Sequence, residues 1–182
     1  GSKYKAAAET ELQTLLYIQQ QQARPDSVLF TVQKLNAPNS VEKGIFAPAV
    51  FNGNQFLITS TQTDSVKIPG TNPFHSRLFY AEYAMGSLQT VTPLTLAADA
   101  TMNQGAATMS ADGKHLYFTQ WTKQNGQTVS SIYYSTKEGE TWSKPALLTS
   151  INLAGYNSKQ PFCSADGKHL FFSSDRPGGA GM

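Results

Sequence analysis

The heptapeptide Ser-Ala-Asp-Gly-Lys-His-Leu occurs twice in this 182-residue chain, at residues 110–116 and again at 164–170. Asp112 and Asp166 are 54 residues apart, a spacing typical of repeated structural units. Each copy continues into strand-forming residues, Tyr-Phe-Thr in the first and Phe-Phe-Ser in the second. Gly adopts the positive φ of a tight turn without steric cost, and Asp tolerates it better than most residues. The repeat therefore predicts a tight turn followed by a strand, used more than once.

A degenerate third copy precedes these two. Residues 47–51 form an apolar run, Asn52-Gly53-Asn54 supplies the turn, and residues 55–60 form a stronger apolar run that ends in Thr-Ser. The chain then divides into three units, at about residues 45–100, 104–152 and 159–182, of which the last is incomplete. Turn residues separate four predicted strands in each complete unit. These strands are 47–51, 55–60, 77–83 and 88–96 in the first unit, and 105–110, 114–121, 129–136 and 141–149 in the second; the third unit opens at 160 and reaches a strand at 169–174.

Two further elements precede the units. Residues 3–22 predict a helix, because apolar residues recur at spacings of three and four among good helix formers, and Pro25 ends it. The helix either packs on the following domain or is the last helix of a preceding helical-repeat domain. Residues 28–35 predict one leading strand. We therefore place a helical segment at 1–24 and a β domain at 25–182.

The composition bears on which classes of function the chain can have. Charged residues make up 14% of the chain, the net charge is +2 and no basic block is present, so nothing indicates nucleic-acid binding. The single cysteine, Cys163, allows no intrachain disulfide and lies in an apolar run that favours a buried thiol. No stretch approaches the length of a membrane span. Gly1-Ser2 resembles a cloning remnant, so the sequence is uninformative about a targeting segment.

Antiparallel four-stranded units of this length are typical of the blades of a β-propeller. The fold expected is all-β, with about two and a half blades and the leading strand, preceded by one helix. The third strand of the last unit would fall beyond Met182. We therefore expect a segment of a larger repeat domain, in which strand 28–35 completes a blade whose other strands lie outside the sequence.

Residues 164–179, which end in Asp-Arg-Pro-Gly-Gly, resemble the TolB-like or WD40-like propeller repeat found in OmpA-family envelope proteins of Bacteroidetes-type bacteria. Trp142-Ser-Lys-Pro145 and Ile151-Asn152 resemble the linker that leads into the next blade of that family. The resemblance covers residues 28–182, is strong in the second and third units, and is weak in the first. The first unit lacks both the Asp-Gly-Lys turn and the Asp-Arg-Pro-Gly-Gly end.

The resemblance implies a location and a role. It implies a periplasmic, outer-membrane-associated protein that binds other envelope proteins or components of a secretion machine. Related proteins carry helical repeats before the propeller and an OmpA-type peptidoglycan-binding domain after it. The remaining blades of the same propeller would be further partners, and no cofactor is implied. A propeller offers rigid loops for binding, and the fold alone specifies no chemistry.

The acidic and imidazole side chains of the repeat have a structural interpretation. Asp112 and Asp166 head Asp-Gly turns, where a carboxylate commonly bonds its own turn backbone. His115 and His169 recur with the repeat, and His75 lies in a predicted loop. A zinc site would need further ligands that the sequence does not supply, so no metal site is predicted.

Four residues are the candidates for partner binding: Asp175, Arg176, Trp121 and Trp142. Asp175 and Arg176 belong to the Asp-Arg-Pro-Gly-Gly segment, where the alternative is an ion pair that braces the loop. The two tryptophans lie near strand ends, and aromatic residues are enriched in interface cores. The same aromatic residues can instead pack between blades.

One segment favours a catalytic alternative. Residues 135–142 resemble the Asp-box of sialidase-type propellers at Ser135, Gly139, Thr141 and Trp142, but Lys137 stands where that motif has Asp. A sialidase would also need an arginine cluster, and the three arginines of this chain are scattered. We therefore predict a non-catalytic interaction module, with a glycan-binding or glycan-hydrolysing sialidase-like propeller as the alternative.

Overall fold

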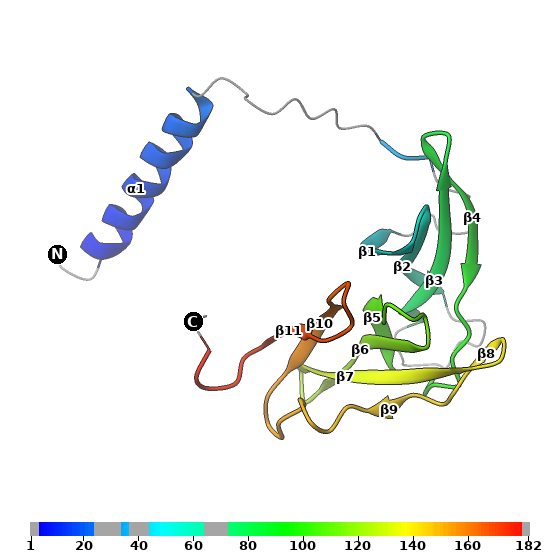
Figure 1. The fold of residues 1–182 in the computed structure, drawn as a ribbon. Helices are drawn as coiled ribbons and strands as arrows, with labels where there is room; N and C mark the ends of the chain where they lie inside the picture. The colour runs from blue at the N-terminus through cyan, green and yellow to red at the C-terminus, as the bar shows by residue number, and fades with distance from the viewer. Residues whose placement is uncertain (1–3, 24–33, 37–43, 64–72, 180–182) are drawn as a thin grey trace. The chain divides into compact units, whose positions relative to one another are not determined.

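The computed structural model describes residues 4–23, 34–36, 44–63 and 73–179 (Figure 1). The chain divides into two compact units, Gly1–Lys34 and Leu35–Met182. The first unit holds the single described helix and the second holds all the described strands. The described residues are thus mostly β, with antiparallel strand pairing throughout.

Helix α1 (Lys5–Gln22) confirms the predicted N-terminal helix. None of its side chains is buried, and Leu12, Leu15 and Leu16 are all largely exposed. Ala23 follows as the C-cap residue, two positions before Pro25. This helix is not long and apolar enough to cross a membrane, and it is the only helix among the residues described.

The first sheet is a meander in the order β1-β2-β3-β4. It confirms the degenerate first unit, with the predicted turn at Asn-Gly-Asn between the first two strands. Gly53 in that turn has φ +53°, the conformation that glycine adopts at no steric cost. The strands are β1 (Ile45–Asn52), β2 (Gln55–Thr63), β3 (Phe74–Ala84) and β4 (Ser87–Pro93).

The second sheet repeats the meander, with one departure in its last strand. A single fourth strand was expected over residues 141–149, but the structure has two separate two-residue pieces that both pair with β7. Pro145 lies between the pieces and has no amide hydrogen for a ladder, which explains the interruption. The strands are β5 (Asn103–Met109), β6 (His115–Gln124), β7 (Gln127–Glu138), β8 (Thr141–Trp142) and β9 (Ala146–Leu147).

The third sheet is the hairpin of β10 (Ser158–Cys163) and β11 (Leu170–Ser174). It confirms the two strands expected for the incomplete unit. The expected leading strand at 28–35 lies outside the described residues except for Lys34 and Leu35, which are not in a strand. The described strands form three sheets and no closed ring.

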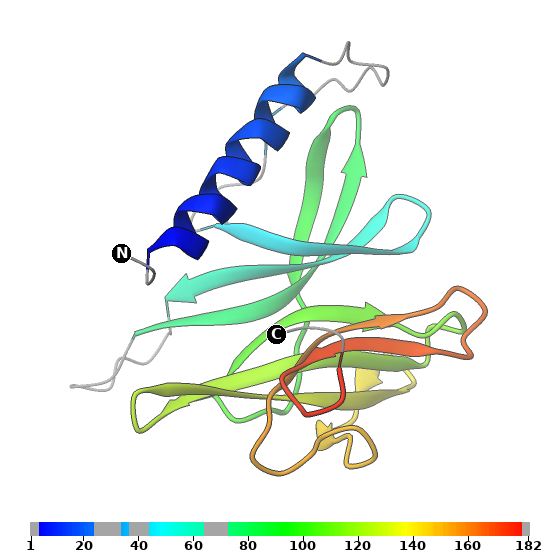
Figure 2. The ribbon, with the colours of Figure 1, turned by 90° about the vertical axis from the view of Figure 1, so that its left-hand side faces the viewer.

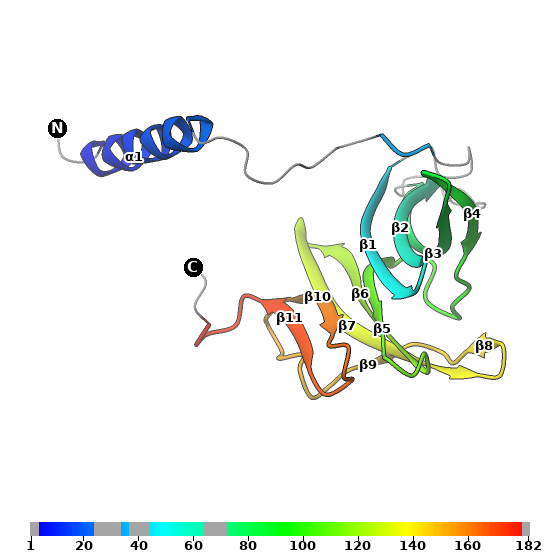
Figure 3. The ribbon, with the colours of Figure 1, turned by 45° about the horizontal axis from the view of Figure 1, so that its top comes forward.

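The three sheets pack in chain order (Figure 3). Strand β5 contacts β1, β2 and β3 of the first sheet, and β10 contacts β5, β6 and β7 of the second. Figure 2 shows the orange and red hairpin lying along the second sheet. In both cases, the first strand of one sheet covers a face of the sheet before it.

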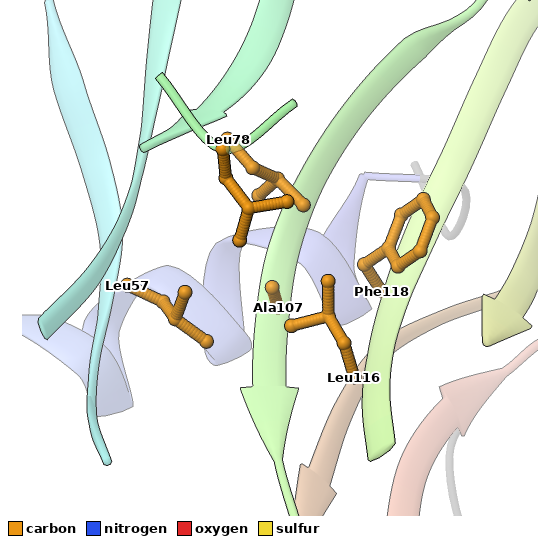
Figure 4. Close-up of a cluster of buried hydrophobic side chains, with 6 residues drawn as sticks. Leu57, Leu78, Ala107, Leu116 and Phe118 are labelled. Atoms are coloured by element: carbon orange, nitrogen blue, oxygen red, sulfur yellow. The ribbon is translucent and has the colours of Figure 1, made fainter. Parts of the chain in front are cut away.

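The largest buried cluster lies between the first two sheets (Figure 4). It combines side chains of both sheets, so neither sheet buries its apolar face alone. Fully burying a Leu or Phe side chain contributes roughly 1.5–3 kcal/mol. The cluster consists of Leu57, Leu78, Leu94, Ala107, Leu116 and Phe118.

Each first strand contains one non-glycine residue in the left-handed conformation. These residues are Ala47 (φ 49°), Ala106 (φ 47°) and Gln160 (φ 55°), and each lies at a register shift in its strand pair. A bulge of this kind re-aims the strand and leaves one amide outside the ladder of its own sheet. The first strand of the degenerate first unit thus has the same bulge as the first strands of the other two units.

A hydroxyl of the preceding sheet accepts the amide hydrogen at two of these bulges. The Ala106 amide donates to Thr59 Oγ1 at 3.1 Å, and the Gln160 amide donates to Thr119 Oγ1 at 2.9 Å. We call this pair, a left-handed residue and a threonine of the preceding sheet, the sheet joint. Thr59 and Thr119 occupy the same place in β2 and β6, so the joint recurs with the repeat.

Two other hydrogen bonds recur at a 54-residue offset. The Ser76 amide donates to Asn103 Oδ1 at 2.9 Å, and the Ser130 amide donates to Asn157 Oδ1 at 2.8 Å. Asn152 adds a contact within the second unit: its side chain bonds both the amide and the carbonyl of Ile132, at 2.9 and 2.8 Å. The Ile-Asn segment picked out in the sequence thus braces the linker between units.

Candidate functional site

The repeated turn is organised around its aspartate. Asp112 Oδ1 accepts hydrogen bonds from the Ser110 hydroxyl at 2.5 Å and from the Lys114 amide at 3.0 Å. The Ser110 hydroxyl oxygen in turn accepts the His115 amide at 2.9 Å. These bonds, that of Ser110 first, lower the pKa of the exposed Asp112 carboxyl below its ordinary value.

The second copy has the same geometry. Asp166 Oδ1 accepts from the Ser164 hydroxyl at 2.6 Å and from the Lys168 amide at 3.1 Å, which lowers the pKa of that carboxyl as well. The structural interpretation of both aspartates is confirmed. Among the residues that the structure describes, no three His, Cys, Asp or Glu side chains are grouped as they would be to hold a metal ion.

Asp175 and Arg176 both brace the linker that leads into the third sheet. The Asp175 carboxylate accepts the Asn157 amide at 2.7 Å and the Asn157 side-chain amide at 2.8 Å, and the side-chain bond is the main reason its pKa is lowered. The Arg176 guanidinium donates to the Ile151 carbonyl and to Ser158 Oγ. Both side chains are therefore engaged within the unit.

Arg176 has a further contact that fixes its position. Its guanidinium carbon lies 4.8 Å from the centroid of the Phe172 ring, within the range of a cation–π interaction. Its Nε also donates to the Ser174 hydroxyl at 3.0 Å. The sequence suggested an Asp175–Arg176 ion pair as the alternative to partner binding, but the hydrogen bonds of each residue go to different parts of the linker.

The two tryptophans have different surroundings. Trp121 is half-buried beside Gly105, where a Cβ on the glycine would lie 3.0 Å from the indole ring. Trp142 packs against the cluster between the first two sheets, and its Nε1 donates to the Tyr80 hydroxyl at 3.0 Å. The structure does not bring Trp142 together with Asp175 and Arg176, because the aspartate and the arginine bond the linker of the third sheet.

The Asp-box-like segment forms a tight hairpin between β7 and β8. Lys137 pairs with Trp142 and Glu138 with Thr141, around Gly139 at φ +61°. The Ser135 hydroxyl, at the base of the hairpin, donates to the Ser143 carbonyl at 2.6 Å. The segment has the bracing geometry expected of such a turn, and it carries Trp142 into the space between the sheets.

A cleft of about 1040 Å³ opens between the first and second sheets, at the end that carries the repeated turn. The largest side chains of its apolar floor are Phe51, Tyr80, Met109 and Trp142. The Phe51 and Tyr80 rings are 5.6 Å apart between centroids and tilted against each other. Partial burial raises the pKa of the Tyr80 hydroxyl, and the hydrogen bond from Trp142 offsets part of that rise.

The rim of the cleft carries charges of both signs. Lys114, which directly precedes β6, and Lys137 of β7 are both exposed, and the Lys137 amide donates to the Lys114 carbonyl at 2.8 Å. Glu82, Asp112 and Glu140 line the same cleft. An aromatic floor with a charged rim suits a polar segment that carries an exposed hydrophobic or ring-shaped group.

Sequence reasoning found part of this site. Trp142 was a candidate from its sequence position, whereas Tyr80 was not among the candidates. The cleft itself was missed, because Phe51, Tyr80 and Trp142 come from three strands and meet only when the sheets pack. The spacing between these residues carries no signal of that contact.

The chain was compared with protein-family profiles, with curated proteins and with solved structures. None of the three comparisons found a match.

Proposed function

We propose that residues 35–182 are consecutive blades of a β-propeller that serves as a non-catalytic, protein-binding module in a bacterial cell envelope. Support for the blades comes from the recurring sheet joint and from two antiparallel meanders that follow one another in chain order. Support for the envelope location comes only from the resemblance of residues 164–179 to TolB-like repeats of OmpA-family proteins. That resemblance implies a periplasmic protein associated with the outer membrane or with a secretion machine.

The observation that carries the binding role is the cleft between the first two sheets. It is a concave site between two sheets, with an aromatic floor and with charged side chains at its rim. Binding sites with these properties bury a hydrophobic group and orient it through a few polar contacts. A segment of an envelope protein with an aromatic or aliphatic anchor beside acidic residues would fit next to Lys114 and Lys137.

A reversal of charge at the rim tests this role. Wild-type protein and the variants Lys114→Glu/Lys137→Glu and Lys123→Glu/Lys144→Glu are immobilised and exposed to a periplasmic extract. Both variants change the net charge equally, and all four lysines are exposed, but Lys123 and Lys144 lie outside the cleft. We expect the wild type and the second variant to retain the same partner and the first variant to lose it. Equal retention by all three proteins, or none by any, would contradict the proposal.

A glycan ligand is the second candidate, favoured by Trp142 and Tyr80 in the cleft, since aromatic rings also bind sugar rings. The same three proteins are tested on immobilised peptidoglycan fragments and on sialosides. Retention on glycan alone would favour this candidate over a protein partner. Release of product from a fluorogenic sialoside by the wild type would overturn the non-catalytic assignment.

A further inference from the structure

Each sheet has one face that the next sheet along the chain can cover, and the exposure of this face increases from the first sheet to the third. In β2, Leu57 and Thr59 are fully buried, because β5 covers them. In β6, the equivalent Tyr117 is half-buried and Thr119 is buried, because β10 covers that face. In β11, the equivalent Phe171 is 60% exposed and Ser173 is also exposed. Among the described residues, this face is covered by the next sheet in the first and second sheets and is uncovered in the third.

The other face of each first strand, which packs on the preceding sheet, is buried in the second and third sheets and exposed in the first. Ala107 of β5 and Pro161 of β10 are both buried against the sheet that precedes them. Their equivalent in β1, Pro48, is exposed, and the next residue on that face, Val50, is 63% exposed. The first sheet therefore offers the same strand surface that β5 and β10 use to cover a neighbour.

We propose that the open face of the third sheet, Phe162, Phe171 and Ser173, binds strand β1 of a second copy of this chain, head to tail. This inference shares the sheet joints with the proposed blades, but it does not depend on the binding role of the cleft. The Ala47 amide of the second copy would donate to Ser173 Oγ, as the Ala106 amide donates to Thr59 and the Gln160 amide to Thr119. Ser173 occupies the position equivalent to both threonines.

The chemistry of the two faces fits this partner. The Phe162 and Phe171 rings are 6.5 Å apart between centroids and are both 60% exposed, an apolar pair without a described cover. Pro48 and Val50 would pack on it, and β1 carries no charged side chain from Ile45 to Asn52 that would have to be desolvated. The Ser173 hydroxyl donates to Gln160 Oε1 at 3.2 Å, so its oxygen can still accept an amide hydrogen.

The two faces are different surfaces, so the contact is heterologous and leads to a ring or to an open chain of copies. A copy that lacks one of the two faces can bind only one neighbour, so the assembly cannot grow beyond it. Phe162→Ser/Phe171→Ser removes the receiving face, and Val50→Asp disables the inserting face. Each variant keeps the surface that the other has lost.

Sedimentation equilibrium of the 182-residue chain tests the proposal. We expect the mass of the wild type to rise with concentration, and each variant alone to remain a monomer. An equimolar mixture of the two variants should form a dimer and nothing larger. A control, Met85→Ser/Leu153→Ser, removes two exposed apolar side chains elsewhere and should associate as the wild type does.

Thermal unfolding followed by circular dichroism checks that each variant is folded; all the substituted side chains are largely exposed, which favours retention of the fold. A wild type that stays monomeric at every concentration overturns the proposal. So does a mixture of folded variants that forms no dimer. Association of Val50→Asp alone would show that the contact does not use β1, which also overturns it.

Discussion

At the scale of single residues, two threonine hydroxyls hold successive sheets together. Thr59 and Thr119 are buried and accept the amides of Ala106 and Gln160, which the bulges remove from their own strand ladders. A buried amide without a partner costs about 1–3 kcal/mol, more than the net gain from an ordinary hydrogen bond. The threonines therefore contribute mainly by satisfying an amide that the backbone geometry would otherwise leave unpaired.

Replacing the joint threonine should reveal this contribution. Thr119→Val keeps the shape and the β-branching of the side chain but removes the acceptor for the Gln160 amide. We expect the free energy of unfolding, measured by urea denaturation, to fall by about 1–3 kcal/mol. The matched change at Thr128, which is exposed in β7, should have almost no effect. A loss at position 119 no larger than that at 128 would contradict the role of the joint.

At the scale of elements, the bulge in each first strand has a conformational cost. A non-glycine residue in the left-handed region is about 1–2 kcal/mol less stable than in its ordinary conformations. Ala47, Ala106 and Gln160 all adopt it. The structure keeps the bulge because it presents an amide to the neighbouring sheet.

Replacing each of two adjacent alanines of β5 with glycine should change the stability of the protein differently. Ala106→Gly relieves the left-handed backbone and should be neutral or stabilising by up to about 1 kcal/mol, after the entropy cost of glycine. Ala107 has no such strain and is buried in the core, so Ala107→Gly should destabilise by about 1–2 kcal/mol. Chemical denaturation of both variants gives the comparison. A clear loss of stability at position 106 would mean that the alanine methyl group matters more than the backbone strain.

The elements themselves were largely predictable from the sequence. Alternating apolar residues and Asn-Gly or Asp-Gly turns located strands β1 to β7, β10 and β11 because both signals are local. The broken fourth strand of the second sheet was not predicted, since pairing of two-residue pieces depends on β7 rather than on their own sequence. The bulges were also missed, because alanine and glutamine do not mark a left-handed residue.

The candidate site was less predictable. Asp175 and Arg176 drew attention as a charged pair beside glycines, and the structure shows them bonded to the linker. Their partners, Asn157 and Ile151, are far enough along the chain that only folding brings them together. The same holds for the cleft, whose aromatic floor is assembled from β1, β3 and β8.

At the scale of the whole molecule, the sheet joints link the stability of the three sheets. The amides of Ala106 and Gln160 are protected by contacts between sheets, not by the ladder of one sheet. Exchange of these amides requires the sheets to separate. Because the first two sheets share one buried cluster and β10 packs on the second sheet, separation should be equivalent to global unfolding.

Hydrogen exchange measured by NMR tests this coupling. We expect the amides of Ala106 and Gln160 to exchange with the same free energy as that of Ile132, which is fully buried at the centre of β7. The Met85 amide, in the exposed β3–β4 turn, should exchange much faster. Exchange at Gln160 at a clearly lower free energy than at Ala106 would show that the third sheet detaches on its own.

The placement of the joint has a consequence for the history of such chains. Each complete unit carries both halves of the connection, a left-handed amide in its first strand and a hydroxyl in its second. A genetic duplication or deletion of one whole unit therefore leaves every pair of neighbouring units with a complete joint, whereas a change of half a unit breaks one. Selection can therefore lengthen or shorten such an array by whole units without changing any sheet joint.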